Sequence, residues 1–116
     1  DPRTGAWLEN EMQEPRAEIV VAGHICLDLI PDFGDRRREA GELLAPGKVT
    51  NVGPVRVSPG GVVSNTGLAL QRLGVPARLM GKVGDDLFGA AVLDLVRRHG
   101  PELAEAMVVS DRTRSG

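Results

Sequence analysis

Two adjacent glycines, Gly60 and Gly61, precede an apolar-periodic segment, and Asn65 follows one turn later in the stretch SPGGVVSNTGLALQRLG. The pattern predicts a junction between a strand and a helix, where free backbone N–H groups and the positive end of the helix dipole converge. Without Cβ atoms the main chain there is open to a polar ligand, and the Asn65 amide can both donate to and accept from hydroxyl groups. A tight connection explains the same glycines without a ligand, so both interpretations stay open.

A carboxylate, Asp28, interrupts the apolar stretch EIVVAGHICLDLIP. Burying an unpaired charge is costly, so this side chain needs a partner, a cavity or water. We expect it to accept hydrogen bonds from the vicinal hydroxyls of a ligand; the alternative is a strand-end Asp that faces water. His24 and Cys26 alternate onto the same strand face, and we expect a packed histidine and a small buried cysteine there.

Other arrangements that carry chemistry are absent from the sequence. Asp85 and Asp86 suit the start of a helix, where a capping side chain and the helix dipole both favour a carboxylate, so no metal site is predicted. The chain has no P-loop motif, no dinucleotide fingerprint after the first strand and no Cys/His cluster with zinc spacing.

Composition narrows the function classes further. The chain has 116 residues, 41% of them hydrophobic, which is enough for the core of one small domain or part of a larger one. A net charge of -2 and 3% aromatic residues argue against nucleic acid as a partner. No apolar run is long enough to span a membrane, and the single cysteine favours a reducing, cytoplasmic setting.

The elements that position these side chains are strands alternating with helices. This alternation predicts an α/β fold with a mostly parallel sheet. Residues 1–17 are expected to be a flexible leader. The expected elements are a strand over 19–31 interrupted at Gly23, two short antiparallel strands around Val49 and Val55–Val57, a helix over 63–73 capped by Gly74, a strand over 77–84, a helix from Leu87 to about His99, and a strand over 106–110. On the first helix, a buried stripe of Val63, Gly67 and Leu70 is expected, flanked by Thr66, Ala69 and Leu73.

The stretches PGGVVSNTGLALQRLG, GKVGDDLFG and GHICLDLIP together resemble the N-terminal signature of the PfkB family of carbohydrate kinases. Gly60, Gly61, Asn65, Gly74 and Gly84 occupy the places of that signature in register. The segment over about 42–58 is similar to the family's lid strands. Two positions depart from the pattern: Val63 stands where Gly, Ala or Pro is usual, and Gly67 where Ser, Thr or Ala is usual.

The resemblance implies a ribokinase-like three-layer sandwich with a small β lid, of which this chain is an incomplete N-terminal portion. It also implies phosphorylation of a sugar or nucleoside hydroxyl with ATP and Mg²⁺, and a homodimer formed through the lid. Asp28, Gly60, Gly61 and Asn65 would bind the substrate. The family's catalytic Gly-x-Gly-Asp motif and its ATP site do not occur in residues 18–116, so no catalytic residue is assigned and we expect the chain alone to be inactive. A non-catalytic α/β module that binds or regulates through a small molecule is the alternative.

Overall fold

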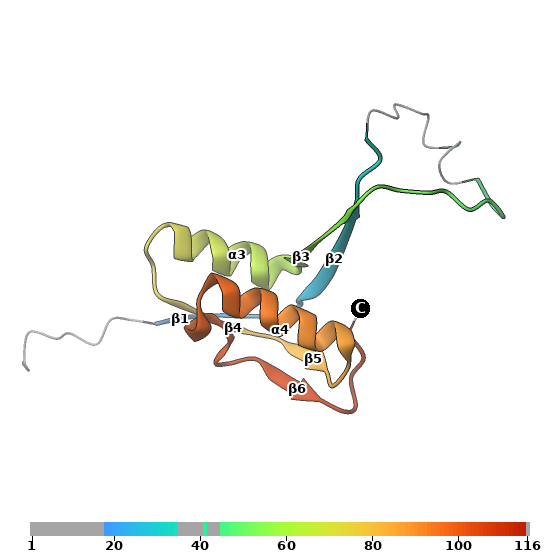
Figure 1. Ribbon diagram of the computed structural model, residues 1–116. Helices are drawn as coiled ribbons and strands as arrows, with labels where there is room; N and C mark the ends of the chain where they lie inside the picture. The colour runs from blue at the N-terminus through green and yellow to red at the C-terminus, as the bar shows by residue number, and fades with distance from the viewer. Residues whose placement is uncertain (1–17, 35–40, 42–44, 116) are drawn as a thin grey trace, which may run out of the picture.

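The computed structural model describes residues 18–34, 41 and 45–115, and its strands and helices alternate along the chain (Figure 1). The elements are β1 (Ile19–Ala22), β2 (Cys26–Pro31), β3 (Val55–Gly60), α3 (Gly61–Arg72), β4 (Ala77–Met80), β5 (Lys82–Gly84), α4 (Leu87–His99), the 3-10 helix η1 (Pro101–Ala104) and β6 (Val108–Ser110). The expected leader, residues 1–17, and residues 42–44 of the expected lid lie outside the described residues. In the described ranges, no helix is both long and apolar enough to cross a membrane.

Parallel strands form the body of the molecule. β1 pairs with β4, with Ile19 opposite Ala77, and β5 pairs with β6, with Lys82 opposite Val108. Parallel strands require long crossover connections, which α3 and α4 supply. The prediction of an α/β fold with parallel strands is therefore confirmed.

Two predicted strands are each divided in the structure. Gly81 separates β4 from β5, and a Cβ atom at this glycine would lie 2.7 Å from Cγ2 of Ile25, so the Ile25 side chain packs closely against the main chain at this break. Gly23, with φ of 145°, separates β1 from β2. The interruption predicted at Gly23 is therefore confirmed, and beyond it β2 pairs antiparallel with β3 rather than with the parallel strands.

The antiparallel pair of β2 and β3, residues 26–31 and 55–60, is called the β2–β3 arm below; it projects away from the helices in Figure 1. Directly opposite residues share a face, so Leu29 lies with Val57 on one face and Asp28 with Ser58 on the other. The arm therefore has a largely apolar face and a face that carries the Asp28 carboxylate.

The strand predicted around Val49 does not form. Residues 45–54 contain no strand, and the Val49 side chain is 96% exposed. The antiparallel partner of Val55–Val57 is instead Leu29–Pro31, and the pairing extends to Asp32, whose carbonyl accepts from the Gly53 amide at 2.7 Å. The alternating apolar pattern of β2 thus predicted a strand better than the β-branched composition around Val49 did.

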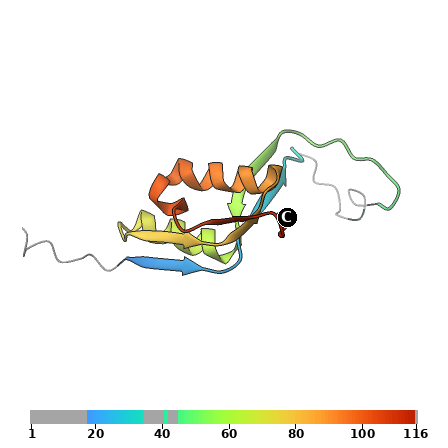
Figure 2. The same cartoon turned by 90° about the horizontal axis from the view of Figure 1, so that it is seen from below.

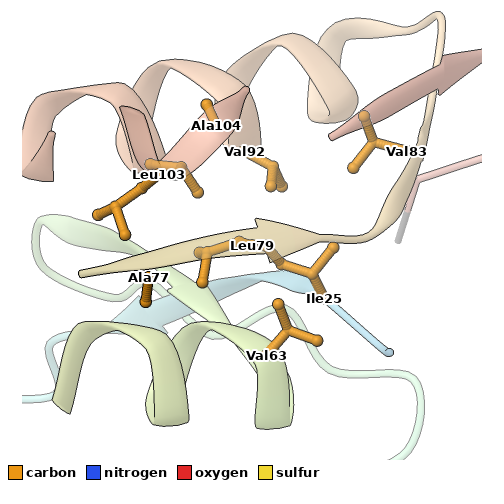
Figure 3. Packing of buried hydrophobic residues seen from close by; sticks show 9 residues of the cluster. Ile25, Val63, Ala77, Leu79, Val83, Val92, Leu103 and Ala104 are labelled. Atoms are coloured by element: carbon orange, nitrogen blue, oxygen red, sulfur yellow. The ribbon is translucent and has the colours of Figure 1, made fainter. Parts of the chain in front are cut away.

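The helices lie on opposite sides of the strands, which makes three layers (Figure 2). Figure 3 shows Val63 of α3 below β4, and Val92 of α4 with Leu103 and Ala104 of η1 above it. The buried cluster consists of Ile25, Val63, Ala77, Leu79, Val83, Val92, Val96, Leu103 and Ala104. Burial of this apolar surface between the layers is the main stabilising contribution.

The faces of α3 and β1 differ in part from those predicted. Val63 and Gly67 are buried as expected, but Leu73 is 78% exposed and Thr66 and Ala69 are also exposed, so the predicted flanking stripe is wrong. The apolar run of β1 predicted a strand covered on both faces; Ile19 and Val20 are 40% and 47% exposed because, in the described part of the chain, only β4 pairs with β1.

Both helix ends that the sequence predicted are present. Gly74 has φ of 75°, its amide donates to the Gln71 carbonyl, and the Val75 amide donates to the Leu70 carbonyl at 3.0 Å, which is the Schellman pattern of a helix end. At the start of α4, the Asp86 side chain accepts from the Gly89 amide at 2.8 Å. Local capping chemistry therefore sets where α3 stops and α4 begins.

Candidate functional site

The Asp28 side chain lies against Gly60, at the point where the β2–β3 arm runs into α3. In the antiparallel register Cys26 is opposite Gly60 and Asp28 is opposite Ser58, so the Asp28 side chain is a diagonal neighbour of Gly60 on the same face. A Cβ atom on Gly60 would collide with the carboxylate group of Asp28. The missing side chain at Gly60 thus leaves the space that this carboxylate occupies.

Gly61 is required by the main chain itself. Its φ is 85°, a conformation that glycine adopts without a steric penalty. A Cβ atom there would lie 2.7 Å from the His24 carbonyl oxygen and 3.1 Å from Cα of Ile25. That same His24 carbonyl accepts from the Val63 amide at 3.2 Å, so it binds one of the free N–H groups at the start of α3.

These contacts give both glycines a structural reason, which the sequence left open as an alternative. A ligand that approaches this junction would meet the Asp28 carboxylate and the backbone around Gly60 and Gly61. Binding of a ligand by these residues stays a prediction.

Asn65 lies four residues after Gly61 in α3, so the two residues share a face of the helix. The residue is exposed, and within the described ranges no hydrogen bond involves its amide group. The start of α3 therefore brings together Asp28, Gly60 and Gly61. Asn65 lies one turn further along the helix.

Cys26 is the nearest side-chain partner of Asp28. Its thiol donates to Oδ1 of Asp28 at 3.5 Å, and burial, followed by this hydrogen bond and the carboxylate charge, raises the pKa of the Cys26 thiol. Cys26 is half-buried rather than buried, and His24 is exposed, so the predicted packing of His24 is wrong. The reason is that the chain turns at Gly23 and presents His24 at the surface.

A hollow of about 290 Å³ lies beside this segment. Its lining comes from three parts of the chain: His24, Ile25 and Cys26; the segment over 113–115; and Lys82, Val83 and Val92. Sequence analysis missed Lys82 and the segment over 113–115, because only the folded chain brings the DRTRS stretch back to the first strands. The local signal for the close approach of the segment over 113–115 is the spacing of Gly84 and Gly89 around Asp86.

No group of three or more His, Cys, Asp or Glu side chains in the part of the chain that the structure describes is arranged to hold a metal ion. The candidate residues offer hydrogen-bonding groups: a carboxylate, an amide and the N–H groups at a helix start. Such a set suits a ligand with several hydroxyl groups.

Comparison with known proteins places the chain in a family. Residues 16–115 match the model of the pfkB family carbohydrate kinases, so the chain belongs to this family. The chain is 35% identical over 82 residues to ribokinase of Bacillus subtilis (strain 168), covering 71% of this chain and 26% of that protein. It is 30% identical over 97 residues to fructokinase-2 of Oryza sativa subsp. japonica, covering 84% and 25%. The chain thus spans about a quarter of the length of these curated relatives.

Solved structures show the same fold. A fructokinase with bound ATP from Xylella fastidiosa superimposes with a TM-score of 0.60 at 18% identity, covering 86% of this chain and 26% of that one. The nucleoside kinase of Burkholderia thailandensis, solved in complex with inosine, gives a TM-score of 0.55 at 30% identity and covers 85% and 30%. The ribokinase-like fold predicted for an incomplete portion is therefore confirmed.

Proposed function

We propose that the complete protein containing this chain transfers a phosphoryl group from ATP to a hydroxyl of a sugar or sugar-like substrate such as a nucleoside. This chain would orient the substrate and would be inactive alone. Family membership supports the reaction class. The observation that carries the role of this chain is the Asp28 carboxylate, held over Gly60 at the start of α3.

Asp28 would accept hydrogen bonds from substrate hydroxyls. A charged acceptor makes stronger hydrogen bonds than a neutral one, and one of its oxygens already accepts from the Cys26 thiol, which restricts its orientation. The backbone at Gly60 and Gly61 and the Asn65 amide would contact further hydroxyls. Holding the reacting hydroxyl in one orientation is the contribution of positioning to catalysis.

ATP and Mg²⁺ are implied by the family, and a relative of known structure carries bound ATP. In the described ranges, the acidic side chains do not form a cluster that fits Mg²⁺. We therefore assign neither group to a residue of this chain and derive no step of the reaction through them.

The apolar face of the β2–β3 arm supports a homodimer formed through the lid. Leu29, Val55 and Val57 share this face and are 54%, 52% and 50% exposed. A two-stranded sheet is marginally stable when its apolar face is in water, and a second copy presents a matching surface. The small-molecule substrate and the single cysteine fit a cytoplasmic enzyme.

The experiment is an ADP-release assay with a panel of sugars and nucleosides, run on the complete protein and on the 116-residue chain in parallel. We expect turnover of at least one sugar or nucleoside by the complete protein and none by the chain alone. Absence of turnover by the complete protein, combined with ligand binding in a calorimeter, would replace the kinase with the non-catalytic binding module. Turnover by the chain alone would contradict the proposed division of roles.

A further inference from the structure

The Asp86 carboxylate binds two separate parts of the chain. Its Oδ1 accepts from the Gly89 amide at 2.8 Å, which is the ordinary cap of α4. Its Oδ2 accepts from the Ser115 amide at 2.9 Å, 29 residues further along. A helix cap requires only one oxygen, so the second bond is not explained by the start of α4.

The contact around Asp86 extends to the end of β5. The Ser115 hydroxyl accepts from the Gly84 amide at 2.7 Å. A Cβ atom on Gly84 would lie 2.6 Å from the Thr113 carbonyl oxygen, and a Cβ atom on Gly89 would lie 2.9 Å from the Ser115 hydroxyl. Two glycines thus leave room for the segment over 113–115 to cross the start of α4, and Asp86 holds it there.

This held segment forms one wall of the hollow described above. Thr113, Arg114 and Ser115 line the same hollow as His24, Ile25 and Cys26, and Cys26 in turn binds Asp28. The position of the segment therefore contributes to the shape of the hollow beside the Asp28 strand. The positive charge of Arg114 also attracts the Asp86 carboxylate.

We propose that Asp86 is a positioning residue for substrate binding: one oxygen caps the start of α4, and the other fixes the segment over 113–115 as part of the lining of the hollow beside the Asp28 strand. Asp86 itself would not touch the substrate. The expected effect on substrate use rests on the kinase function proposed above, whereas the effect on the segment does not.

The test uses Asp86→Ser in the complete protein. Serine caps helices about as well as aspartate, but its single, shorter side-chain oxygen is unable to reach Ser115 while it caps α4. Asp85→Ser is the matched control, because Asp85 is an exposed neighbour and none of its side-chain atoms has a hydrogen bond in the described part of the chain. Amide hydrogen exchange at Gly89 and Ser115 and steady-state kinetics are measured on each variant.

For Asp86→Ser we expect exchange at Ser115 to accelerate about tenfold or more while Gly89 stays protected. The KM for the sugar should rise about tenfold, equivalent to about 1.4 kcal/mol, with kcat and the KM for ATP within about twofold of the parent. Asp85→Ser should leave all five quantities unchanged. Restoring the second oxygen with Asp86→Glu should recover part of the Ser115 protection.

Unchanged exchange at Ser115 in Asp86→Ser would overturn the proposal. Loss of protection at both Gly89 and Ser115 would also overturn it, because the start of α4 would then have been lost as well. Faster Ser115 exchange beside an unchanged sugar KM would also overturn it, since the segment would then be held without any consequence for the substrate. A parent protein that phosphorylates none of the tested sugars contradicts the kinase function, and the exchange data then decide alone whether Asp86 fixes the segment.

Discussion

The carboxylate of Asp28 occupies the space in which a Cβ atom on Gly60 would lie. This contact joins the first strand motif to the glycine pair, although the two are separated by more than thirty positions along the chain. It depends on the antiparallel register that places Asp28 opposite Ser58. The orientation of the acidic group is therefore coupled to the absence of a side chain at Gly60.

Gly60→Ala should impair substrate binding with little effect on the fold. The φ of Gly60 is -115°, which alanine adopts without strain, and the Asp28 side chain can move to another rotamer. We expect the KM for the sugar to rise about tenfold, or about 1.4 kcal/mol, and the free energy of unfolding to change by less than about 1 kcal/mol. Steady-state kinetics and urea unfolding on the same preparation measure both quantities.

The double variant Gly60→Ala/Asp28→Ala supplies the control. If Gly60 acts through Asp28, the two changes should be far from additive, and the double variant should have about the KM of Asp28→Ala alone. Fully additive losses would show that Gly60 contacts the substrate independently of Asp28.

Gly61→Ala should destabilise the protein, because the change combines a strained backbone with a collision. Gly74→Ala is the matched control: its φ of 75° is similar to the 85° of Gly61, but nothing lies within 4 Å of its Cβ position. A left-handed conformation costs a non-glycine residue roughly 1–2 kcal/mol, which both variants should lose. Gly61→Ala should lose about 1 kcal/mol or more in addition, through the His24 carbonyl. Equal losses in the two variants would show that the contact with His24 is unimportant.

Gly67→Ala should also lower stability, although alanine favours helices by about 1 kcal/mol over glycine. Gly67 is buried in α3, and its Cβ would collide with the Leu79 side chain of β4. Overpacking of this kind costs about 1–3 kcal/mol, so a net loss is expected in urea unfolding. Leu79→Ala is destabilising by itself, but the further cost of Gly67→Ala should be smaller in the Leu79→Ala background than in the parent. A stabilised Gly67→Ala variant would contradict the close approach of α3 to β4.

Local signals in the sequence were sufficient for the helices. The ends of α3 and α4 depend on Gly74 and Asp86, whose capping chemistry acts within a few residues, and both were predicted. The strands depend on distant partners. Gly23 was a local signal for the break between β1 and β2, but the antiparallel pairing of β3 with β2 depends on residues far apart in the sequence, and the strand predicted around Val49 was wrong for this reason.

In the candidate site, too, local patterns could be predicted from the sequence and contacts between distant residues could not. The family signature picked out Asp28 and the glycine pair, but only the register of the β2–β3 arm shows that Asp28 fills the space beside Gly60. Asn65 follows from helical spacing alone. The hydrogen bond between Asp86 and Ser115 spans 29 residues of the sequence. Ser115 belongs to a polar stretch with no periodic pattern, so the sequence held no signal for this contact.

Asp86 should also make stability depend on pH in acid. The amide groups of Ser115 and Gly89 hold the pKa of the Asp86 carboxyl below its usual range. Because the folded pKa is lower than the unfolded value of about 3.9, the stabilising contribution is complete above that value and is lost as the pH falls through the folded pKa. Urea unfolding between about pH 6 and pH 2 should show a shallower acid decline for Asp86→Asn than for the parent. Parallel curves would show that Asp86 gains no such stabilisation on folding.

The central claim, that this chain orients the substrate of a sugar kinase through Asp28, is tested most directly by the KM for the sugar of Asp28→Ala in the complete protein. Loss of hydrogen bonds to a charged group costs about 2 kcal/mol or more, so we expect the KM to rise roughly thirtyfold, with little change in thermal stability. Asp94→Ala is the control, because the Asp94 side chain forms only an exposed ion pair with Arg98 within the described residues. The KM of this variant should match that of the parent. An Asp28→Ala protein that melts early while its folded fraction keeps the parent KM would contradict the claim and leave Asp28 a purely structural residue.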